Sequence, residues 1–230
     1  IDQFYPETAF NFIEVLKKAG CEVHYNPEQT CCGQPSFNSG YWKETKTLAI
    51  KFMNDFNNAE LIVAPSASCT GFVKNYYKKV FSDDSGILGK VADLSPRIFE
   101  ISDFLVNRIQ KVDFNAEFNH KVTFHDSCAG LREYGINKEP RILLRNVKGL
   151  ELVEMENLTT CCGFGGTFAA KFHSISTAMT EQKVESALKT GAEYIVSTEA
   201  SCLMNIEAYI KKQKLPIKTI HLVDVLASEK

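Results

Sequence analysis

The stretch Cys161-Cys162-Gly163 repeats an earlier one, Cys31-Cys32-Gly33. Each triplet follows a helix end that runs through a glycine into an expected strand. Each is followed by a second expected strand that ends in the same three residues, Ala67-Ser68-Cys69 in the first half and Ala200-Ser201-Cys202 in the second. Because the same order of features occurs twice, the sequence predicts two copies of one structural unit.

The second copy opens with a further cysteine, Cys128, at the end of an expected strand. The flanking glycines Gly20 and Gly149 set the offset between the copies, and this offset projects the counterpart of Cys128 to a point ahead of Ile1. Tyr134 and Tyr5 obey the same offset, which supports the register. We therefore expect the first copy to lack its opening cysteine through truncation or disorder.

Hydrophobic periodicity indicates helices and strands in alternation. Helices are expected at residues 7 to 19, 41 to 58, 70 to 81, 96 to 111, 138 to 148, 174 to 190 and 203 to 213, with a last helix after His221. Strands are expected at 22 to 25, 61 to 65, 121 to 125, 150 to 154, 193 to 197 and 217 to 221. This order predicts an α/β fold of two pseudo-symmetric repeats, 1–115 and 116–230, built from βα units with small parallel sheets. The motif cysteines would lie at the C-terminal ends of strands, where open α/β sheets bind ligands.

The composition limits the choice of partners. Hydrophobic residues make up 44% of the chain, and 26 basic residues nearly balance 28 acidic ones, which argues against nucleic-acid binding. Apolar runs such as Ile62-Val63-Ala64 are far too short to cross a bilayer, so no membrane insertion is expected. The chain begins with Ile1 and leaves a signal peptide open; we expect a soluble, cytoplasmic protein.

Seven of the eight cysteines belong to the repeated pattern, and these are the expected cofactor and metal ligands: Cys31, Cys32, Cys69, Cys128, Cys161, Cys162 and Cys202. In the complete second copy, four thiolates would converge on one point. Iron-sulfur clusters and structural zinc both take four such ligands, and the absence of paired Cys-x-x-Cys knuckles favours a cluster. Adjacent cysteines reach one site only across a bend, which Gly33 and Gly163 permit. Cys21, whose counterpart is Leu150, is expected in the core.

Other chemistries stay open on the residues alone. The vicinal cysteines could cycle through a disulfide as a thiol switch, or the thiolates could hold structural zinc in a protein that binds a partner. His125 and Asp126 could form an acid-base pair or donate to a cluster sulfur, although a histidine bonded to backbone is the more common arrangement. His221 could cap the last helix. The sequence contains no recognisable nucleotide, flavin or nicotinamide motif.

Four segments carry a resemblance to a known family: Asp2 to Pro6, Thr30 to Pro35, Cys161 to Phe168 and Cys202 to Ile206. The chain resembles the cysteine-rich CCG domain proteins typified by the cysteine-rich subunit of heterodisulfide reductase, and more closely the lactate-utilisation A or glycolate oxidase iron-sulfur subunit type. The resemblance implies [4Fe-4S] clusters, one per repeat, in an electron-transfer subunit. It also implies partner oxidoreductase subunits that together oxidise L-lactate or a similar 2-hydroxy acid; it leaves open whether this chain is catalytic by itself.

The sequence departs from heterodisulfide reductase at one position of each copy. There the motif ends in Cys-x-x-Cys, whereas here Ser66 and Glu199 stand at the first cysteine of that pair. Ordinary four-thiolate ligation or an asymmetric site is expected in place of the unusual clusters and the disulfide-reducing chemistry of that enzyme.

Overall fold

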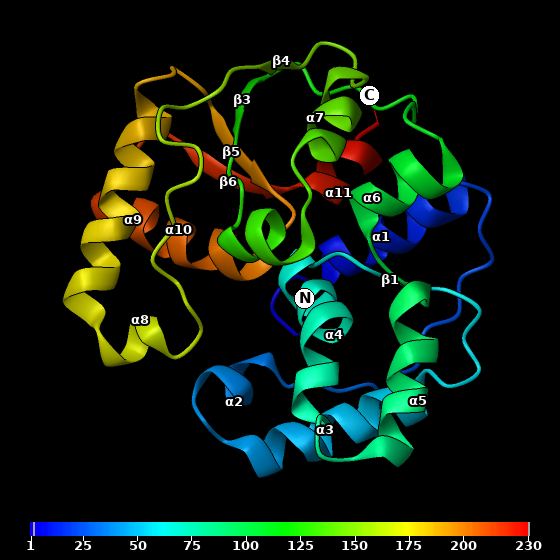
Figure 1. Ribbon diagram of the computed structural model, residues 1–230. Coiled ribbons are helices and arrows are strands. Elements are labelled where there is room, and N and C mark those ends of the chain that lie inside the picture. The colour runs from blue at the N-terminus through cyan, green and yellow to red at the C-terminus, as the bar shows by residue number, and fades with distance from the viewer. Residues whose placement is uncertain (2, 230) are drawn as a thin grey trace.

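Two separate parallel sheets organise the computed structural model, which describes residue 1 and residues 3–229 (Figure 1). The smaller sheet pairs β1 (Ile62–Ala64) with β2 (Ile98–Glu100). The larger sheet has the order β4-β3-β5-β6, with bounds β3 Lys121–Phe124, β4 Glu151–Leu152, β5 Tyr194–Ser197 and β6 Lys218–His221. All these pairs are parallel, which confirms the predicted α/β class with small parallel sheets.

Helices surround both sheets (Figure 1). Their bounds are α1 Pro6–Lys18, α2 Gln34–Asn38, α3 Trp42–Asp55, α4 Ala67–Val80, α5 Ser85–Leu94, α6 Ile101–Asp103, α7 Lys138–Arg145, α8 Phe168–Lys171, α9 His173–Leu188, α10 Ala200–Gln213 and α11 Leu222–Ala227. Tighter or wider helical turns complete the set: η1 Ser95–Arg97, η2 Phe104–Ile109 and η3 Gly130–Tyr134. Within the described residues, no helix is long and apolar enough to cross a membrane.

The start of α4 shows how sequence produces the geometry of the site. Ser66 is its N-cap in an extended conformation, and the Ser66 hydroxyl accepts a hydrogen bond from the backbone N–H of Cys69. Strand β1 therefore passes directly into a capped helix. Cys69 is thereby held in the first turn of α4, at the C-terminal end of β1.

Two expected elements are wrong. Residues 22 to 25 form no strand, because the smaller sheet of the described chain contains only β1 and β2 and leaves this stretch without a partner. Residues 96 to 111 are not one helix, because Ile98–Glu100 pairs with β1 instead. Ile98 is buried in the sheet, and this tertiary packing outweighs the helical periodicity of the sequence. Helices α2, α5 and α8 were not expected as separate elements.

The hydrophobic core of the described residues has three parts. One cluster belongs to the first half and contains Phe72 and Tyr77; another belongs to the second half and contains Val184 and Ile206. The third cluster draws on both halves, because Leu16 of α1 packs in the same group as strand residues of the larger sheet and residues of α11. Figure 1 shows α1 lying beside α11, although the two helices come from opposite ends of the chain. The boundary between residues 115 and 116 stays a prediction.

Candidate functional site

The first cysteine site contains Cys31, Cys32 and Cys69. The vicinal pair lies in the loop before α2, and Cys69 lies at the start of α4. The thiol of Cys32 is in hydrogen-bonding contact with both other thiols. Cys32 in the middle of this row is buried, whereas Cys31 at one end is exposed.

The second cysteine site contains Cys128, Cys161, Cys162 and Cys202. Cys161 is in contact with Cys128 and with Cys162, and Cys162 is in turn in contact with Cys202. Cys128 follows β3 and Cys202 follows β5, while the vicinal pair lies in the loop before α8. The structure thus brings all four thiols into one continuous row. All eight cysteines of the chain are free thiols.

A left-handed glycine creates the bend between adjacent cysteines. Gly33 has φ 93° and Gly163 has φ 88°, and each backbone N–H points at the preceding Sγ, at 3.5 Å for Cys31 and 3.4 Å for Cys161. The expectation that glycine permits this bend is confirmed. A side chain at Gly163 would place its Cβ 2.4 Å from the carbonyl oxygen of Ser176. The second loop therefore lies directly on α9.

Contact among the thiols divides them into proton donors and thiolates. A hydrogen bond from Cys32 lowers the pKa of Cys31 to about 6. Hydrogen bonds from Cys128 and Cys162 hold the pKa of Cys161 far below its usual range, and the same contacts raise the pKa values of Cys128 and Cys162. Thiolates are the nucleophilic and metal-binding form of cysteine. The pKa of Cys69 is lowered in the same way by Cys32, so the thiolate form is favoured at two sulfurs of the first site and at Cys161 in the second.

His125 lies at the end of β3, fully buried beside the second site. One of its ring nitrogens and the sulfurs of Cys162 and Cys202 all lie within 4.8 Å of one another. Neither ring nitrogen has a hydrogen-bond partner among the described residues, so the interpretation of a ring bonded to backbone is wrong. Asp126 instead makes a buried, two-pronged ion pair with Arg141, at 2.9 and 2.8 Å, so Asp126 is not the acid-base partner of His125.

The backbone carbonyl of the buried cysteine is anchored differently in the two sites. In the first, the Tyr77 hydroxyl donates to the Cys32 carbonyl at 2.8 Å. In the second, the Cys162 carbonyl accepts from Thr180 Oγ1 at 2.8 Å and from Asn205 Nδ2 at 3.1 Å. Both anchors hold the inner sulfur in place, one through an aromatic residue and the other through polar side chains.

Lys183 is a further residue of the second site that the sequence analysis missed. Its side chain is 1% exposed, and its ammonium donates to the carbonyls of Asn157 and Leu158, both at 3.0 Å, in the loop that leads to Cys161. Burial lowers the pKa of Lys183, while Asp126 and the nearby cysteine thiolates oppose that effect. A lysine at helical spacing gives no sequence signal that separates it from the exposed lysines of the chain.

Ser66 and Glu199, the two departures from the Cys-x-x-Cys pattern, face each other across the halves. Their backbones form an antiparallel bridge, and the buried Glu199 carboxylate accepts hydrogen bonds from the Ser66 hydroxyl at 3.1 Å and the Ser68 N–H at 2.9 Å. Glu199 therefore belongs to the second half in sequence but lies against the first cysteine site, where its charge acts on Cys69. Only the tertiary structure shows this contact.

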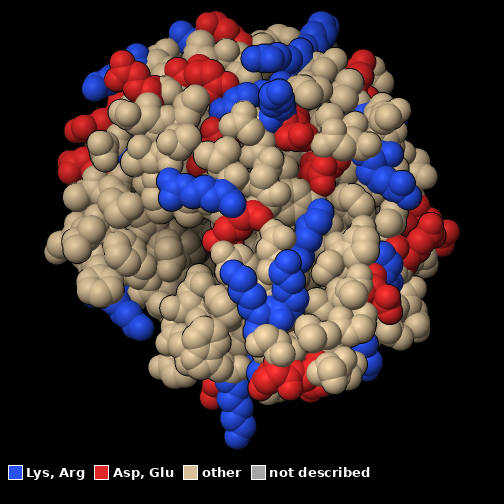
Figure 2. Space-filling view, in the orientation of Figure 1, with Lys and Arg blue, Asp and Glu red and all other residues tan. Residues whose placement is uncertain are grey.

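The two vicinal cysteine loops lie close to one another. The residues that follow them meet where Ser39 Oγ and Thr167 Oγ1 lie 3.1 Å apart. The space-filling view shows a recess walled by uncharged residues on the side where α8 and α2 lie in the ribbon view (Figure 2). Charges of both signs are interspersed around it, so no single-sign field covers this face.

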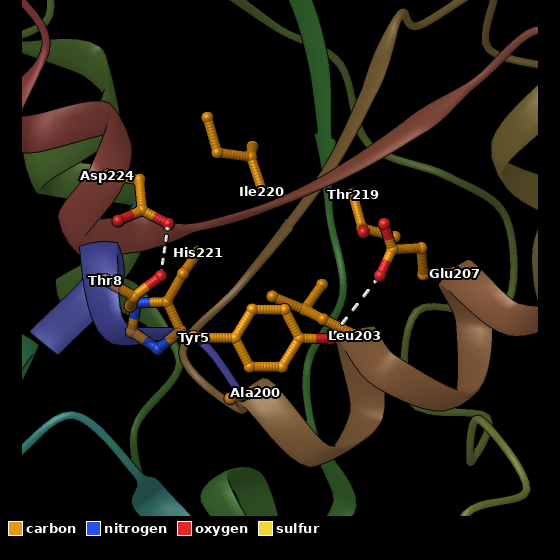
Figure 3. Close-up of a pocket in the computed structure, with 9 residues that line it drawn as sticks. All are labelled: Tyr5, Thr8, Ala200, Leu203, Glu207, Thr219, Ile220, His221 and Asp224. Carbon is orange, nitrogen blue, oxygen red and sulfur yellow. Dashed lines mark hydrogen bonds between the residues drawn. The ribbon is translucent and has the colours of Figure 1, made fainter. Parts of the chain in front are cut away.

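A small pocket elsewhere offers little to an anionic substrate. It lies between α1, α10 and α11, and its polar groups are already paired: Tyr5 donates to Glu207 at 3.5 Å and Thr8 donates to Asp224 at 2.9 Å (Figure 3). Among its lining residues are two carboxylates and no lysine or arginine. His221 in this pocket caps α11 by accepting from the Val223 N–H, which confirms its capping role.

Cys21 lies apart from both cysteine sites. It packs against the core cluster that the two halves share, as the sequence predicted. Cys21 is therefore a suitable control in experiments on the cysteines of the two sites.

Comparison with known proteins places these features in a family. Residues 1–74 and 122–207 match the family described as Cysteine-rich domain, CCG. The chain is 41% identical to Lactate utilization protein A 1 of Bacillus mycoides (strain KBAB4), an alignment that covers 100% of this chain and 94% of the relative. It is 40% identical to Lactate utilization protein A of Geobacillus sp. (strain WCH70), where the alignment covers 99% of this chain and 95% of the relative. An aspartate racemase homologue from Pyrococcus horikoshii OT3 aligns over 96% of this chain and 91% of its own at a TM-score of only 0.30 and 16% identity, too weak a likeness to bear on the fold.

Proposed function

Because this chain belongs to the cysteine-rich CCG domain family, we propose that its two cysteine sites hold iron-sulfur clusters and that the protein carries electrons in a complex oxidising L-lactate or a similar 2-hydroxy acid. The observation that carries the proposal is the continuous row of Cys128, Cys161, Cys162 and Cys202. The names of the relatives support a role in lactate utilisation. The electron-transfer role rests on the chemistry of the thiols.

The residues present fit a cluster of the [4Fe-4S] type. Four thiols lie in one row in the second site, which is the number such a cluster takes, and their contacts already favour the thiolate form of Cys161. The first site offers Cys31, Cys32 and Cys69 within this chain. The N–H of each loop glycine points at a cysteine sulfur, as expected of a backbone that stabilises anionic sulfur. When bound, a cluster would supply one-electron transfer.

Partner subunits are part of this proposal. Oxidation of lactate to pyruvate releases two electrons and two protons, and a protein with one-electron centres must take the electrons in separate steps. The carboxylate-lined pocket between α1 and α10 lacks a cation to hold a hydroxy acid, and no organic-cofactor motif is present in the sequence. Substrate oxidation is therefore assigned to a partner oxidoreductase subunit, and this chain accepts its electrons.

The decisive experiment is anaerobic purification of the full chain followed by assays of iron, acid-labile sulfide and electron paramagnetic resonance. Two double variants, Cys31→Ser/Cys32→Ser and Cys161→Ser/Cys162→Ser, should each remove the cluster of one half. The matched control is Cys21→Ser, which changes a cysteine of the shared core and should keep both clusters. With partner subunits present, the double variants should also lose lactate-dependent reduction of an acceptor.

Other outcomes of the same assays would contradict the proposal. Zinc without sulfide would indicate a structural zinc site. Metal-free protein in which the vicinal cysteines form a reversible disulfide would indicate a thiol switch, for which the lowered pKa of Cys31 is suited. Full lactate-dependent activity in a variant without its cluster would refute electron transfer through that site.

A further inference from the structure

His125 is the most anomalous buried group in the described part of the chain. Its side chain is fully buried, and both Nδ1 and Nε2 lack hydrogen-bond partners there. A buried polar atom without a hydrogen-bond partner destabilises the folded state. Because the imidazole of His125 has two such atoms, we expect the thiols of the second site, or a group bound by them, to supply the missing partner.

Two hydrogen bonds fix the backbone of His125 at the end of β3. The His125 N–H donates to the Val196 carbonyl at 2.8 Å, and the His125 carbonyl accepts from Ser197 Oγ at 3.0 Å. Both bonds tie His125 to β5, the strand that leads to Cys202. They fix the backbone from which the ring projects into the interior, where the side chain is fully buried. It is thus built into the wall of the second cysteine site.

The chemical form of the ring suits metal binding. The ring is fully buried, and burial favours the neutral form of an imidazole. A neutral imidazole has one nitrogen with a free lone pair, which is the form that binds metals. One ring nitrogen of His125 and the sulfurs of Cys162 and Cys202 lie within 4.8 Å of one another. At this separation the three atoms could bind one metal centre.

We propose that His125 is a fifth protein donor of the second site and coordinates iron of the cluster through the ring nitrogen that lies near Cys162 and Cys202. The inference rests on the proposed function and adds a ligand that is not a cysteine. With five donors available to a cluster that takes four, one cysteine can keep its proton while the imidazole takes its place. Imidazole in place of thiolate raises the reduction potential of iron-sulfur centres. The second cluster is thereby the better electron acceptor of the two.

The test begins with full-length protein carrying Cys31→Ser and Cys32→Ser, reconstituted anaerobically with ferrous iron and sulfide, so that only the second site gives a signal. Pulsed electron paramagnetic resonance should show strong nitrogen hyperfine coupling in the reduced protein. Incorporation of ¹⁵N-histidine should change that coupling, which requires no substitution at the site. His125→Gln should abolish the coupling and lower the reduction potential, whereas the exposed control His24→Gln should leave both unchanged.

The possible results separate the two proposals. A reconstituted cluster that shows only the weak coupling of a hydrogen bond, or coupling insensitive to ¹⁵N-histidine, overturns ligation by His125 and leaves the proposed function intact. Wild-type protein that binds no iron and sulfide at the second site overturns the proposed function and this inference together. If His125→Gln does not fold, the isotope experiment on the unsubstituted residue still decides the question.

Discussion

The two cysteine sites share a loop but differ in the walls around it. A Cβ on Gly33 would meet the carbonyl of Thr45, and a Cβ on Gly163 would meet that of Ser176, so these two helix positions correspond. By this register Phe52 stands in the first half where Lys183 stands in the second. Phe52 packs against Tyr77 in an aromatic wall, whereas Lys183 brings a buried positive charge. The repeated backbone has been kept while the electrostatics have diverged.

The carboxylate of Glu199 extends this contrast. It lies against the first site, where its negative charge raises the pKa of Cys69 against the larger lowering effect of Cys32. A negative charge disfavours the addition of an electron and a positive charge favours it. We therefore expect the second cluster to have the higher reduction potential, so that electrons pass from the first half to the second. Two halves of one fold can in this way serve different steps of one electron path.

The largest expected effect compares the two loop glycines. Gly163→Ala would place a Cβ 2.4 Å from a backbone oxygen at a left-handed φ, and should lower the free energy of unfolding by roughly 2–5 kcal/mol. Gly33→Ala has its nearest neighbours at 3.5 Å, so only backbone strain of about 1–2 kcal/mol remains. Denaturant unfolding of both variants measures the difference. Equal losses would show that the second loop does not rest on α9 as described.

A second difference concerns the residues that cap α6 and α11 at the ends of β2 and β6. Burial raises the pKa of Glu100 to about 8, so the folded state holds a proton that the unfolded state releases near pH 4.5. Stability from this group is complete below pH 4.5 and is lost as pH rises toward 8, by roughly 2–4 kcal/mol. Glu100→Gln should remove that part of the decline in unfolding curves measured between pH 5 and 8.5.

His221, the cap of α11, has the opposite dependence. Burial lowers the pKa of His221, so its contribution is lost as pH falls through the unfolded value near 6.5. The control for the Glu100 experiment is Glu185→Gln on the exposed face of α9. An unchanged pH profile in Glu100→Gln would contradict the assignment of the decline to this cap.

Lys183→Met tests the positive wall of the second site. Removing a buried charge at a distance of several ångströms should lower the potential of the second cluster by roughly 50–100 mV, given an effective dielectric constant near 20. Redox titration monitored by electron paramagnetic resonance measures the shift. Lys189→Met removes the same charge from an exposed position at the end of α9 and should change the potential little. Equal shifts in both variants would show that the reduction potential responds to the net charge of the protein rather than to the buried charge beside the second site.

Glu199→Gln should produce the smallest shift, in the opposite direction and in the first cluster. The amide can still accept from Ser66 and Ser68, so the contact between the halves is kept while the charge is lost. The expected rise is roughly 20–60 mV, since burial raises the pKa of Glu199 and so reduces its average charge. The exposed substitution Glu193→Gln is the control. A shift confined to the second cluster would contradict the placement of Glu199 beside the first.

The sequence by itself determined the local features of this protein. The repeated Cys-Cys-Gly triplets predicted left-handed glycines and grouped cysteines, because a bend between adjacent thiols requires that backbone conformation whatever surrounds it. Most helices and all the described strands except β2 followed from periodicity and turn residues. β2 was missed, since Ile98–Glu100 becomes a strand only by pairing with β1, which lies much earlier in the chain.

Only the tertiary structure decided what surrounds each site. Lys183, Glu199 and the unpartnered ring of His125 act across contacts between residues distant in sequence. The motifs singled out His125 and Glu199 but not their surroundings, and they gave no signal for Lys183. Burial and the direction of a side chain set the free energy of a charge or an imidazole, and both depend on the packed chain as a whole. A motif therefore locates the thiols, whereas the fold determines the charges that tune them.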